Sequence, residues 1–424
     1  MHTHVLPLAW RDPAEIALLA CSAPMSAALI SDGSTHARWS YVMTGLEQAS
    51  EPAGGAAAPG PHLMSGTLSL YPYAWNTDHA PDPAWPQPVH LRLTRALVFD
   101  HHQRRAVALG CGQDAGEAQR RAHQIAGLIT SSGQMAPPRR GALAERFTPE
   151  QPDTHYLESV RAVVEAIEAG EIFQANIARA WSGALVSGVR PLDVFARLLE
   201  TSPAPYAAYL DLGERALVSN SPETFLEVEA SSRTIRSRPI KGTRPRKPDP
   251  AADAAAAAEL AASAKDRAEN LMIVDLMRND LAQVCKAGSI RVPELHQVHS
   301  YANVHHLIST VEGRLLSGMG VDEIMKATFP PGSITGAPKH QAMRVIARHE
   351  GSRGPWCGAL VLAGDDGALS ASVLIRTLAF TREGGRWRYR TLAGAGIVAD
   401  SVAEHELAET DAKISAIARA LAEP

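Results

Sequence analysis

Strand-like patterns recur along almost the whole chain, and they constrain its fold more than any other feature. Apolar and polar residues alternate in short runs, as at 66–71 and 89–94, and Gly, Pro, Asp or Asn residues separate these runs. Similar runs predict further strands at 208–212, 216–220, 225–229, 369–380 and 387–398. Runs of strands with several helices among them are typical of the α+β class, so we predict large antiparallel β-sheets.

Helical patterns are fewer. Periodicity predicts helices at 116–130, 154–170 and 404–422, and capping residues predict two more that begin after Asp249 and Ser263. Residues 131–151 are rich in Pro, Gly and Arg and are typical of a linker. We therefore expect two parts, residues 1–150 and residues 151–424.

Composition excludes several classes of protein. The formal net charge of the 424 residues is −4, which argues against a general binder of nucleic acid or acidic membranes. The four cysteines are widely separated and form no Cys-x-x-Cys pair, so we expect a cytoplasmic protein without structural zinc. The apolar stretch 16–30 is interrupted by Pro24 and is too short to span a membrane. A pair of buried strands or a short helix suits it better.

Two pairs of acidic residues lie three positions apart on predicted helices. Glu406 and Glu409 share one side of the last helix with Lys413, next to an apolar stripe. Carboxylates beside a buried face need neutralising, either by an i,i+4 ion pair of Glu409 with Lys413 or by a divalent cation. Asp266 and Glu269 form the second pair, although Asp266 also suits helix capping. Without Cys or His at ligand spacing, two acid pairs suit Mg²⁺ rather than Zn²⁺.

Residues 236–247 concentrate six cations, and the ordinary interpretation of such a segment is a solvated basic loop. Within it, Pro239-Ile240 and Gly242-Thr243 form a rigid frame around Lys241. A lysine held in this way can act as a nucleophile if burial or neighbouring cations lower its pKa. Glu223 would then be a candidate general acid, whereas by itself it is an ordinary turn residue.

Two glycine-rich segments are candidates for binding an anion. Residues 329–339 lead into a helix whose N-terminus can attract negative charge, but they lack the phosphate-binding P-loop pattern. Residues 391–397 offer the backbone N–H groups of Gly394 and Gly396 without forming a dinucleotide fingerprint.

Together these segments resemble the chorismate-utilising enzymes over about residues 154–422. The resemblance rests on 170–176 (GEIFQAN), 221–223 (SPE), 239–243 (PIKGT), 265–270 (KDRAEN), 274–281 (VDLMRNDL), 305–309 (HHLIS), 332–339, 375–377 (IRT), 394–398 and 406–413. It implies that the sheets form a sandwich flanked by helices. Residues 1–150 match only weakly, which makes them a diverged N-terminal part of the same fold, with the chorismate-binding catalytic region at 151–424.

The resemblance also implies which nucleophile the enzyme uses. Relatives that add water to chorismate carry a lysine at the position of Gln174, so a neutral Gln favours ammonia. Lys241 is typical of aminodeoxychorismate synthases, whereas anthranilate synthases usually carry Ala there. The implied product is 4-amino-4-deoxychorismate, a precursor of 4-aminobenzoate and folate. Anthranilate synthesis is the alternative within the family, and a non-catalytic protein that binds an acidic ligand through residues 236–247 is the alternative outside it.

Roles for individual residues follow from the resemblance. Lys241 would attack C2 of chorismate while Glu223 protonates the departing C4 hydroxyl. Mg²⁺ would be held by Glu269 and Glu409, with Asp266 and Glu406 as additional or water-mediated ligands. Arg376 would grip the enolpyruvyl carboxylate, and Lys339 would help to balance charge. The implied substrate-binding residues are Gln174, Thr243, His306, Ser333, Thr335, Arg376, Gly394, Gly396 and Lys413.

The ammonia source is expected in another protein. Cys111 lies in a Gly-Cys-Gly-Gln segment that superficially suggests a glutaminase nucleophile, but the flanking pattern is missing. The resemblance therefore implies a glutamine amidotransferase subunit as partner, with chorismate as substrate and with no nucleic-acid or membrane partner.

Overall fold

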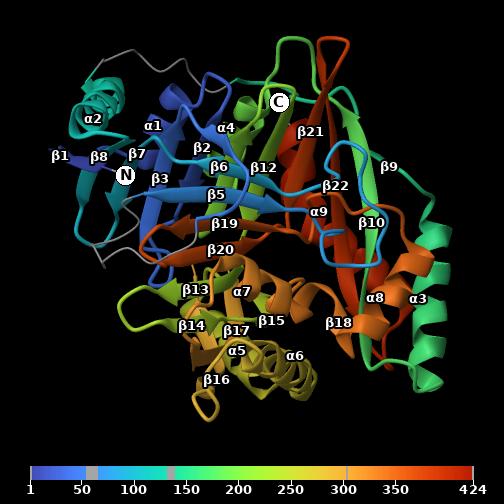
Figure 1. Cartoon of the computed structure of the whole chain (residues 1–424). Coiled ribbons are helices and arrows are strands. Elements are labelled where there is room, and N and C mark those ends of the chain that lie inside the picture. Colours follow the sequence, from blue (N-terminus) through green and yellow to red (C-terminus); the bar gives the residue numbers. More distant parts are fainter. Residues whose placement is uncertain (1, 54–64, 131–138, 302–303, 423–424) are drawn as a thin grey trace.

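Two antiparallel sheets organise the chain in the computed structural model, which describes residues 2–53, 65–130, 139–301 and 304–422 (Figure 1). The strands of the first sheet are, in spatial order, β1 (His2–Leu8), β8 (Arg105–Gly112), β7 (Arg95–Asp100), β3 (Trp39–Thr44), β2 (Ser26–Ile30), β11 (Tyr206–Asp211), β12 (Arg215–Ser221), β21 (Thr377–Glu383), β22 (Arg386–Ile397), β10 (Gln174–Ala184) and β18 (Gly336–Ala337), with β9 (Thr148–Pro149) paired to β10.

The second sheet is formed mostly by the middle of the chain. Its strands are, in spatial order, β15 (Ile240–Pro245), β17 (Val304–Arg314), β14 (Thr234–Ser237), β13 (Thr224–Glu229), β20 (Leu369–Val373), β19 (Ala359–Gly364), β5 (Gly66–Tyr71), β6 (Val89–Arg92) and β4 (Glu47–Ala49), with β16 (Arg291–Ser300) paired to β17. Residues 1–150 thus supply β1–β3 and β7–β9 to the first sheet and β4–β6 to the second.

Helices lie on the outside of the sheets. They are α1 (Pro13–Ala20), α2 (Ala115–Thr130), α3 (Asp153–Glu168), α4 (Pro191–Thr201), α5 (Pro250–Ala262), α6 (Ala264–Ala282), α7 (Val321–Thr328), α8 (Lys339–His349) and α9 (Ala403–Ala422), and a short 3₁₀ turn, η1, spans Gly332–Ile334. Figure 1 shows α2 beside β1 and β8 at one edge, α3 at the opposite edge, and α5 with α6 below β15 and β17. In the described part of the chain, no helix is long and apolar enough to cross a membrane.

Alternating side chains explain why the two sheets stack. Leu360 and Leu362 of β19 pack with Leu217 of β12 in a core between the sheets. The intervening residue Val361 points to the opposite face, where α6 and α7 cover the second sheet. On the outer face of the first sheet, Val218 packs against α1, α2, α4 and α9. The predicted α+β class, with a sandwich flanked by helices, is confirmed.

Most predicted elements are present close to their expected bounds. The amphipathic helix at 154–170 corresponds to α3, the last helix to α9, and the strands at 208–212, 216–220 and 225–229 to β11–β13. Asp249 caps α5 and Ser263 caps α6, as predicted. The apolar stretch 16–30 forms most of α1 and then β2. Of the predicted linker, residues 131–138 lie outside the described part.

One predicted strand is wrong in a way that affects the site. The run 369–380 is two strands, because the chain leaves the second sheet after Val373 and enters the first sheet at Thr377. Between them Arg376 has φ of +51°, a left-handed conformation that breaks the strand. Alternating apolar residues on both sides of the break conceal it in the sequence.

Candidate active site

A cavity of about 680 Å³ opens between the two sheets, where β15 and β17 of one face β10 and β22 of the other. Helices α6 and α9 also line it, and its volume suits a small-molecule ligand. The cavity brings together most of the predicted site residues from distant parts of the chain. They are Glu223, Lys241, Thr243, Asp266, Glu269, His306, Ser333, Arg376, Gly394, Gly396, Glu406, Glu409 and Lys413.

Lys241 reaches the cavity from an irregularity in β15. Ile240 pairs with Ile308 and Thr243 pairs with His306, and the register shifts between these two pairs. Within this bulge Gly242 has φ of +79°, and a Cβ there would lie 2.8 Å from Asp266. Only glycine fits such a backbone against α6 without strain. The bulge therefore explains the Lys-Gly pair of the PIKGT segment.

The amine of Lys241 lies in a buried, partly compensated environment. Its side chain is 12% exposed, and Nζ is 3.7 Å from Glu269 Oε2. Burial lowers the pKa of Lys241, Glu269 acts in the opposite direction, and the positive charge of Lys413 lowers it further. A lowered pKa increases the neutral fraction of the amine, which is the nucleophilic form.

Glu223 is the second buried titratable group of the cavity. It follows Ser221-Pro222 at the start of β13, and its backbone N–H donates to Ser221 Oγ at 3.2 Å. Burial raises the pKa of Glu223 to about 7, although the nearby Ser333 hydroxyl and Lys241 favour its charged form. Ser333 Oγ is near enough for that influence but has no hydrogen-bond partner of ordinary geometry in the described chain. Glu223 can therefore hold a proton near neutral pH.

Arg376 presents an unpaired cation to the same cavity. Its guanidinium has no hydrogen-bond or ion-pair partner among the residues that the structure describes, and burial lowers the pKa of Arg376. A buried guanidinium without a partner can accept a carboxylate in bidentate geometry. His306 lies nearby, with Nδ1 2.9 Å from Thr243 Oγ1, and burial followed by Arg376 lowers the pKa of His306 to about 4. The ring is therefore neutral at physiological pH.

The four predicted metal-binding carboxylates face the cavity, each with its own polar partner. Glu409 Oε1 is 2.6 Å from Lys413 Nζ, Asp266 Oδ2 is 3.2 Å from Arg244 Nη2, and Glu406 Oε1 accepts from Ser401 Oγ at 2.7 Å. The i,i+4 ion pair of Glu409 with Lys413, which the sequence offered as the alternative to a divalent cation, is thus present. The described residues hold no group of three or more potential ligands close enough to form a complete metal site.

These carboxylates also lie close enough to influence one another. Burial raises the pKa of Glu269 and of Glu406, and in both cases the negative charge of Glu409 raises it further. Acidic side chains of α6 and α9 therefore face a common region, where Lys241, Lys265 and Lys413 offset part of their negative charge. Hard carboxylate oxygens are the donors that Mg²⁺ prefers, so these side chains suit a magnesium ion by their chemistry, although in the described residues they are not gathered into a ligand cluster.

Three residues named from the sequence lie outside the cavity lining. Thr335 is buried and donates its hydroxyl proton to Pro331 O at 3.0 Å. Lys339 is bound to Asp280 at 2.5 Å and to Thr328 O at 3.0 Å, so the predicted charge-balancing role of Lys339 in the cavity is wrong. The sequence indicated that a helix starts near Lys339, but it did not indicate that Asp280 on α6 is the ion-pair partner of this lysine.

Gln174 lies directly behind the lining. It is fully buried, and neither its amide nitrogen nor its amide oxygen has a hydrogen-bond partner in the described residues. A Cβ placed on Gly396 would lie 2.9 Å from Gln174 Nε2 and 3.3 Å from Lys241 Nζ. The absence of a side chain at Gly396 therefore leaves the amide and the amine facing one small space.

Several lining residues were not singled out from the sequence. They are Asn176, Arg244, Lys265, Trp356 and Cys357. Lys265 favours the charged forms of Glu269, Glu406 and Glu409. Because it lies in the KDRAEN segment, it could have been identified from the sequence. Trp356 and Cys357 carried no comparable signal, because an apolar Trp-Cys pair is an ordinary core feature.

Comparisons with known proteins identify the family of the chain. Residues 10–419 match the family model described as chorismate binding enzyme. Aminodeoxychorismate synthase component 1 of Escherichia coli K12 is 41% identical over 327 residues, 77% of this chain and 68% of that protein. Anthranilate synthase component 1 of Streptomyces coelicolor is 38% identical over 346 residues, 78% of this chain and 66% of that protein.

A solved structure shows the same fold. The crystal structure of anthranilate synthase component I from Streptococcus pneumoniae superposes with a TM-score of 0.77 at 22% identity, covering 99% of this chain and 92% of that one. The family match spans nearly the whole chain, including the N-terminal part that resembled the family only weakly in sequence. The chain therefore belongs to the family of chorismate-binding enzymes.

Proposed function

We propose that this protein is component 1 of an aminodeoxychorismate synthase, which converts chorismate and ammonia to 4-amino-4-deoxychorismate. The observation that carries the proposal is the buried amine of Lys241, which shares the cavity with the protonatable Glu223 and faces the neutral amide of Gln174. The relatives named aminodeoxychorismate synthase component 1 support the same activity. Anthranilate synthase relatives make anthranilate formation the second candidate.

The residues support a two-step displacement. The neutral amine of Lys241 attacks C2 of chorismate, the C4–O bond breaks, and Glu223 gives its proton to the departing hydroxyl, which leaves as water. Ammonia then attacks C4 and expels Lys241 from C2, and the surplus proton of the new amine returns to the Glu223 carboxylate. Arg376 is free to hold a carboxylate of the substrate throughout. Gln174 is neutral and cannot act as the base that water would need.

We propose that Mg²⁺ is the cofactor, held by Glu269 and Glu409 with Asp266 and Glu406 as additional or water-mediated ligands. When bound, the ion would act as a Lewis acid toward a substrate carboxylate. The gathering of carboxylates from α6 and α9 in one cavity supports this assignment. Lys413 forms an ion pair with Glu409 and also donates to Gly394 O at 2.9 Å, which links α9 to β22.

The ammonia is proposed to come from a separate glutamine amidotransferase subunit in the cytoplasm. Support comes from the component 1 naming of the relatives, which implies a second component. Cys111 is no substitute for a glutaminase nucleophile, because it is fully buried in β8 and burial raises the pKa of its thiol to about 11.

Product identification tests the proposed reaction. The protein is incubated with chorismate, MgCl₂ and a large excess of an ammonium salt near neutral pH, and the products are separated by chromatography. We expect a non-aromatic aminated product that an added lyase converts to 4-aminobenzoate. Fluorescent anthranilate with release of pyruvate would instead assign the chain to the second candidate. No turnover of chorismate under these conditions would favour the non-catalytic alternative.

Metal removal is expected to abolish activity. Chelation by EDTA should stop product formation, and added Mg²⁺ should restore it. Glu409→Gln should raise the Mg²⁺ concentration for half-maximal activity by about tenfold or more, because a neutral amide is a weaker ligand than a carboxylate. Glu404→Gln is the matched control, since Glu404 lies on the same helix but pairs with Arg161. An unchanged Mg²⁺ requirement in Glu409→Gln would contradict the assignment.

A further inference from the structure

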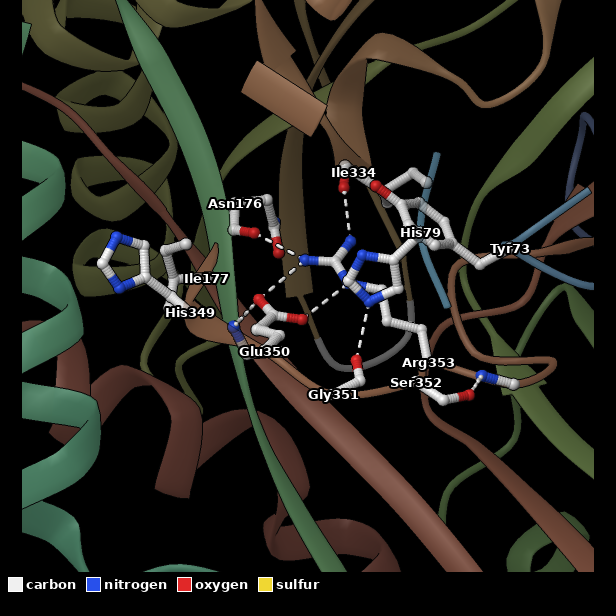
Figure 2. Close-up of polar contacts among 12 residues, drawn as sticks. Tyr73, His79, Asn176, Ile177, Ile334, His349, Glu350, Gly351, Ser352 and Arg353 are labelled. Carbon is white, nitrogen blue, oxygen red and sulfur yellow. Dashed lines mark hydrogen bonds and ion pairs between the residues drawn. The ribbon is translucent and has the colours of Figure 1, made fainter. Parts of the chain in front are cut away.

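Figure 2 shows the polar contacts of Arg353, a fully buried arginine whose partners include residues next to the cavity. The Arg353 side chain is 0% exposed and forms two hydrogen bonds with the Glu350 carboxylate, of 2.7 Å from Nε and 2.9 Å from Nη2. Nη1 also donates to Ile334 O at 3.1 Å, and Nη2 donates to Asn176 O at 2.7 Å. Glu350 in turn accepts from the backbone N–H of Ala178 at 2.7 Å. The pair therefore holds three separate segments together.

Each of those segments carries residues of the cavity wall. Asn176 at the start of β10 lines the cavity, as does Ile334 in η1 beside Ser333. The two segments also meet directly, because Asn176 N donates to Thr335 O at 2.7 Å. Arg353 itself begins the turn that leads to Trp356, which lines the cavity as well. One guanidinium thus links β10, η1 and this turn.

Aromatic rings close the site of Arg353 from two further directions. Its guanidinium lies 4.5 Å from the ring centre of Tyr73 and 5.0 Å from that of Trp356. His79 packs edge-on against Tyr73, and its Nε2 is 2.6 Å from Gly351 O. Burial, followed by the charge of Arg353, lowers the pKa of His79, so this ring stays neutral. The N-terminal part of the chain therefore supports the catalytic region at this point.

Charge alone does not explain the arrangement. Burial by itself would lower the pKa of Arg353, but the charge and hydrogen bonding of Glu350 together with the nearby Tyr73 and Cys357 raise the pKa, so the guanidinium stays charged. A lysine would also balance Glu350, yet its ammonium lacks the planar fork that reaches Glu350, Ile334 O and Asn176 O together. The three-way geometry therefore requires arginine.

We propose that Arg353, held by Glu350, is a positioning residue that fixes the wall segments of Asn176, Ile334 and Trp356 relative to the reacting groups. This inference rests on the proposed function only for its effect on turnover. Arg353 does not need to contact the substrate for this role, because its guanidinium acts through the backbone carbonyls of the wall segments. Small displacements of such a wall lower turnover strongly, since misplacement by about 1 Å can cost about a hundredfold.

Arg353→Lys separates positioning from charge balance. We expect kcat to fall by about tenfold to a hundredfold, with a KM for chorismate within about threefold of the original value. The melting temperature should fall less than in Arg353→Met, because the lysine still neutralises Glu350. The matched control is Arg92→Lys, which alters a similar arginine fork on Asp365 away from the cavity and should keep full turnover.

A second readout does not depend on activity. Cys357 is fully buried in the cavity wall, so a thiol reagent should label it slowly. If Arg353 fixes that wall, Arg353→Lys should raise the labelling rate of Cys357 by about tenfold, while Cys21 stays protected. Peptide mass spectrometry distinguishes the two sites.

The outcomes separate this inference from the proposed function. Unchanged kcat and unchanged Cys357 labelling in Arg353→Lys would overturn it. A second outcome would also overturn the inference. If the melting temperature falls in both Arg353→Lys and Glu350→Gln while the turnover per folded molecule is unchanged, the pair has a purely stabilising role. If the unaltered protein does not convert chorismate, the proposed function fails, and the labelling rates still decide whether Arg353 orders the wall.

Discussion

Lys241→Ala is expected to lower the rate of chorismate amination by a factor on the order of a thousand or more, because it removes the proposed nucleophile. The amine lies in a buried cavity with a lowered pKa and faces the Gln174 amide across the space that Gly396 leaves open. Intact-mass spectrometry should also show a covalent chorismate adduct on the unaltered protein and none on the variant. These measurements test the chemical role and not only the fold.

Two further variants sharpen this test. Lys241→Arg keeps the positive charge beside Glu269 but supplies a poor nucleophile, so it should be nearly as inactive as Lys241→Ala. Lys247→Ala removes an exposed cation from the same loop and should retain full activity. An adduct that persists in Lys241→Ala, or high activity in Lys241→Arg, would refute the assignment of Lys241 as nucleophile.

Glu223→Gln is expected to lower kcat by about a hundredfold to ten-thousandfold, because the amide cannot protonate the departing hydroxyl. In the unaltered protein the pKa of Glu223 is raised by burial to about 7, and only the protonated form is a general acid. Loss of this proton should therefore lower the rate as pH rises, whereas deprotonation of Lys241 should raise it, so the two groups together predict a bell-shaped profile. A full pH–rate profile of kcat measures both limbs.

The residual activity of Glu223→Gln should lack the falling limb. Glu229→Gln, which changes an exposed carboxylate at the end of the same strand, should keep it. If Glu223→Gln retains both high activity and the falling limb, another group is the acid.

Burial of Glu223 also has a consequence for stability. Its pKa is about 7 in the folded chain and has its ordinary value of 4.5 when unfolded, so the unfolded chain loses its proton first. The contribution of Glu223 is favourable below about pH 4.5 and is lost as pH rises through about 7. The melting temperature of Glu223→Gln should lack this decline, which also shows that the variant is folded.

The sequence predicted much of the local structure and the chemical inventory of the site. Helical spacing placed Glu406, Glu409 and Lys413 on one side of α9, and all three line the cavity. The Pro and Gly residues around Lys241 indicated a rigid frame, which the structure shows as a bulge with Gly242 at positive φ. These features depend on near neighbours in the chain, where spacing and backbone preferences are sufficient.

Other features depended on contacts between distant segments. The break at Arg376, the pairing of Lys339 with Asp280, and the position of Gln174 behind Gly396 each involve residues that the sequence does not bring together. The same is true of Arg353, since its partners lie on β10 and η1. No spacing rule identifies such partners, because they are set by how two sheets stack.

For this protein, then, the amino-acid sequence by itself determined the α+β class, the family resemblance and the residue types available for catalysis. The tertiary structure alone decided which of those residues share a cavity and which are left without a partner. It also decided their chemistry, because burial between the sheets lowers the pKa of Lys241 and raises that of Glu223. Desolvation is a property of packing, so it appears only when distant segments are folded against one another.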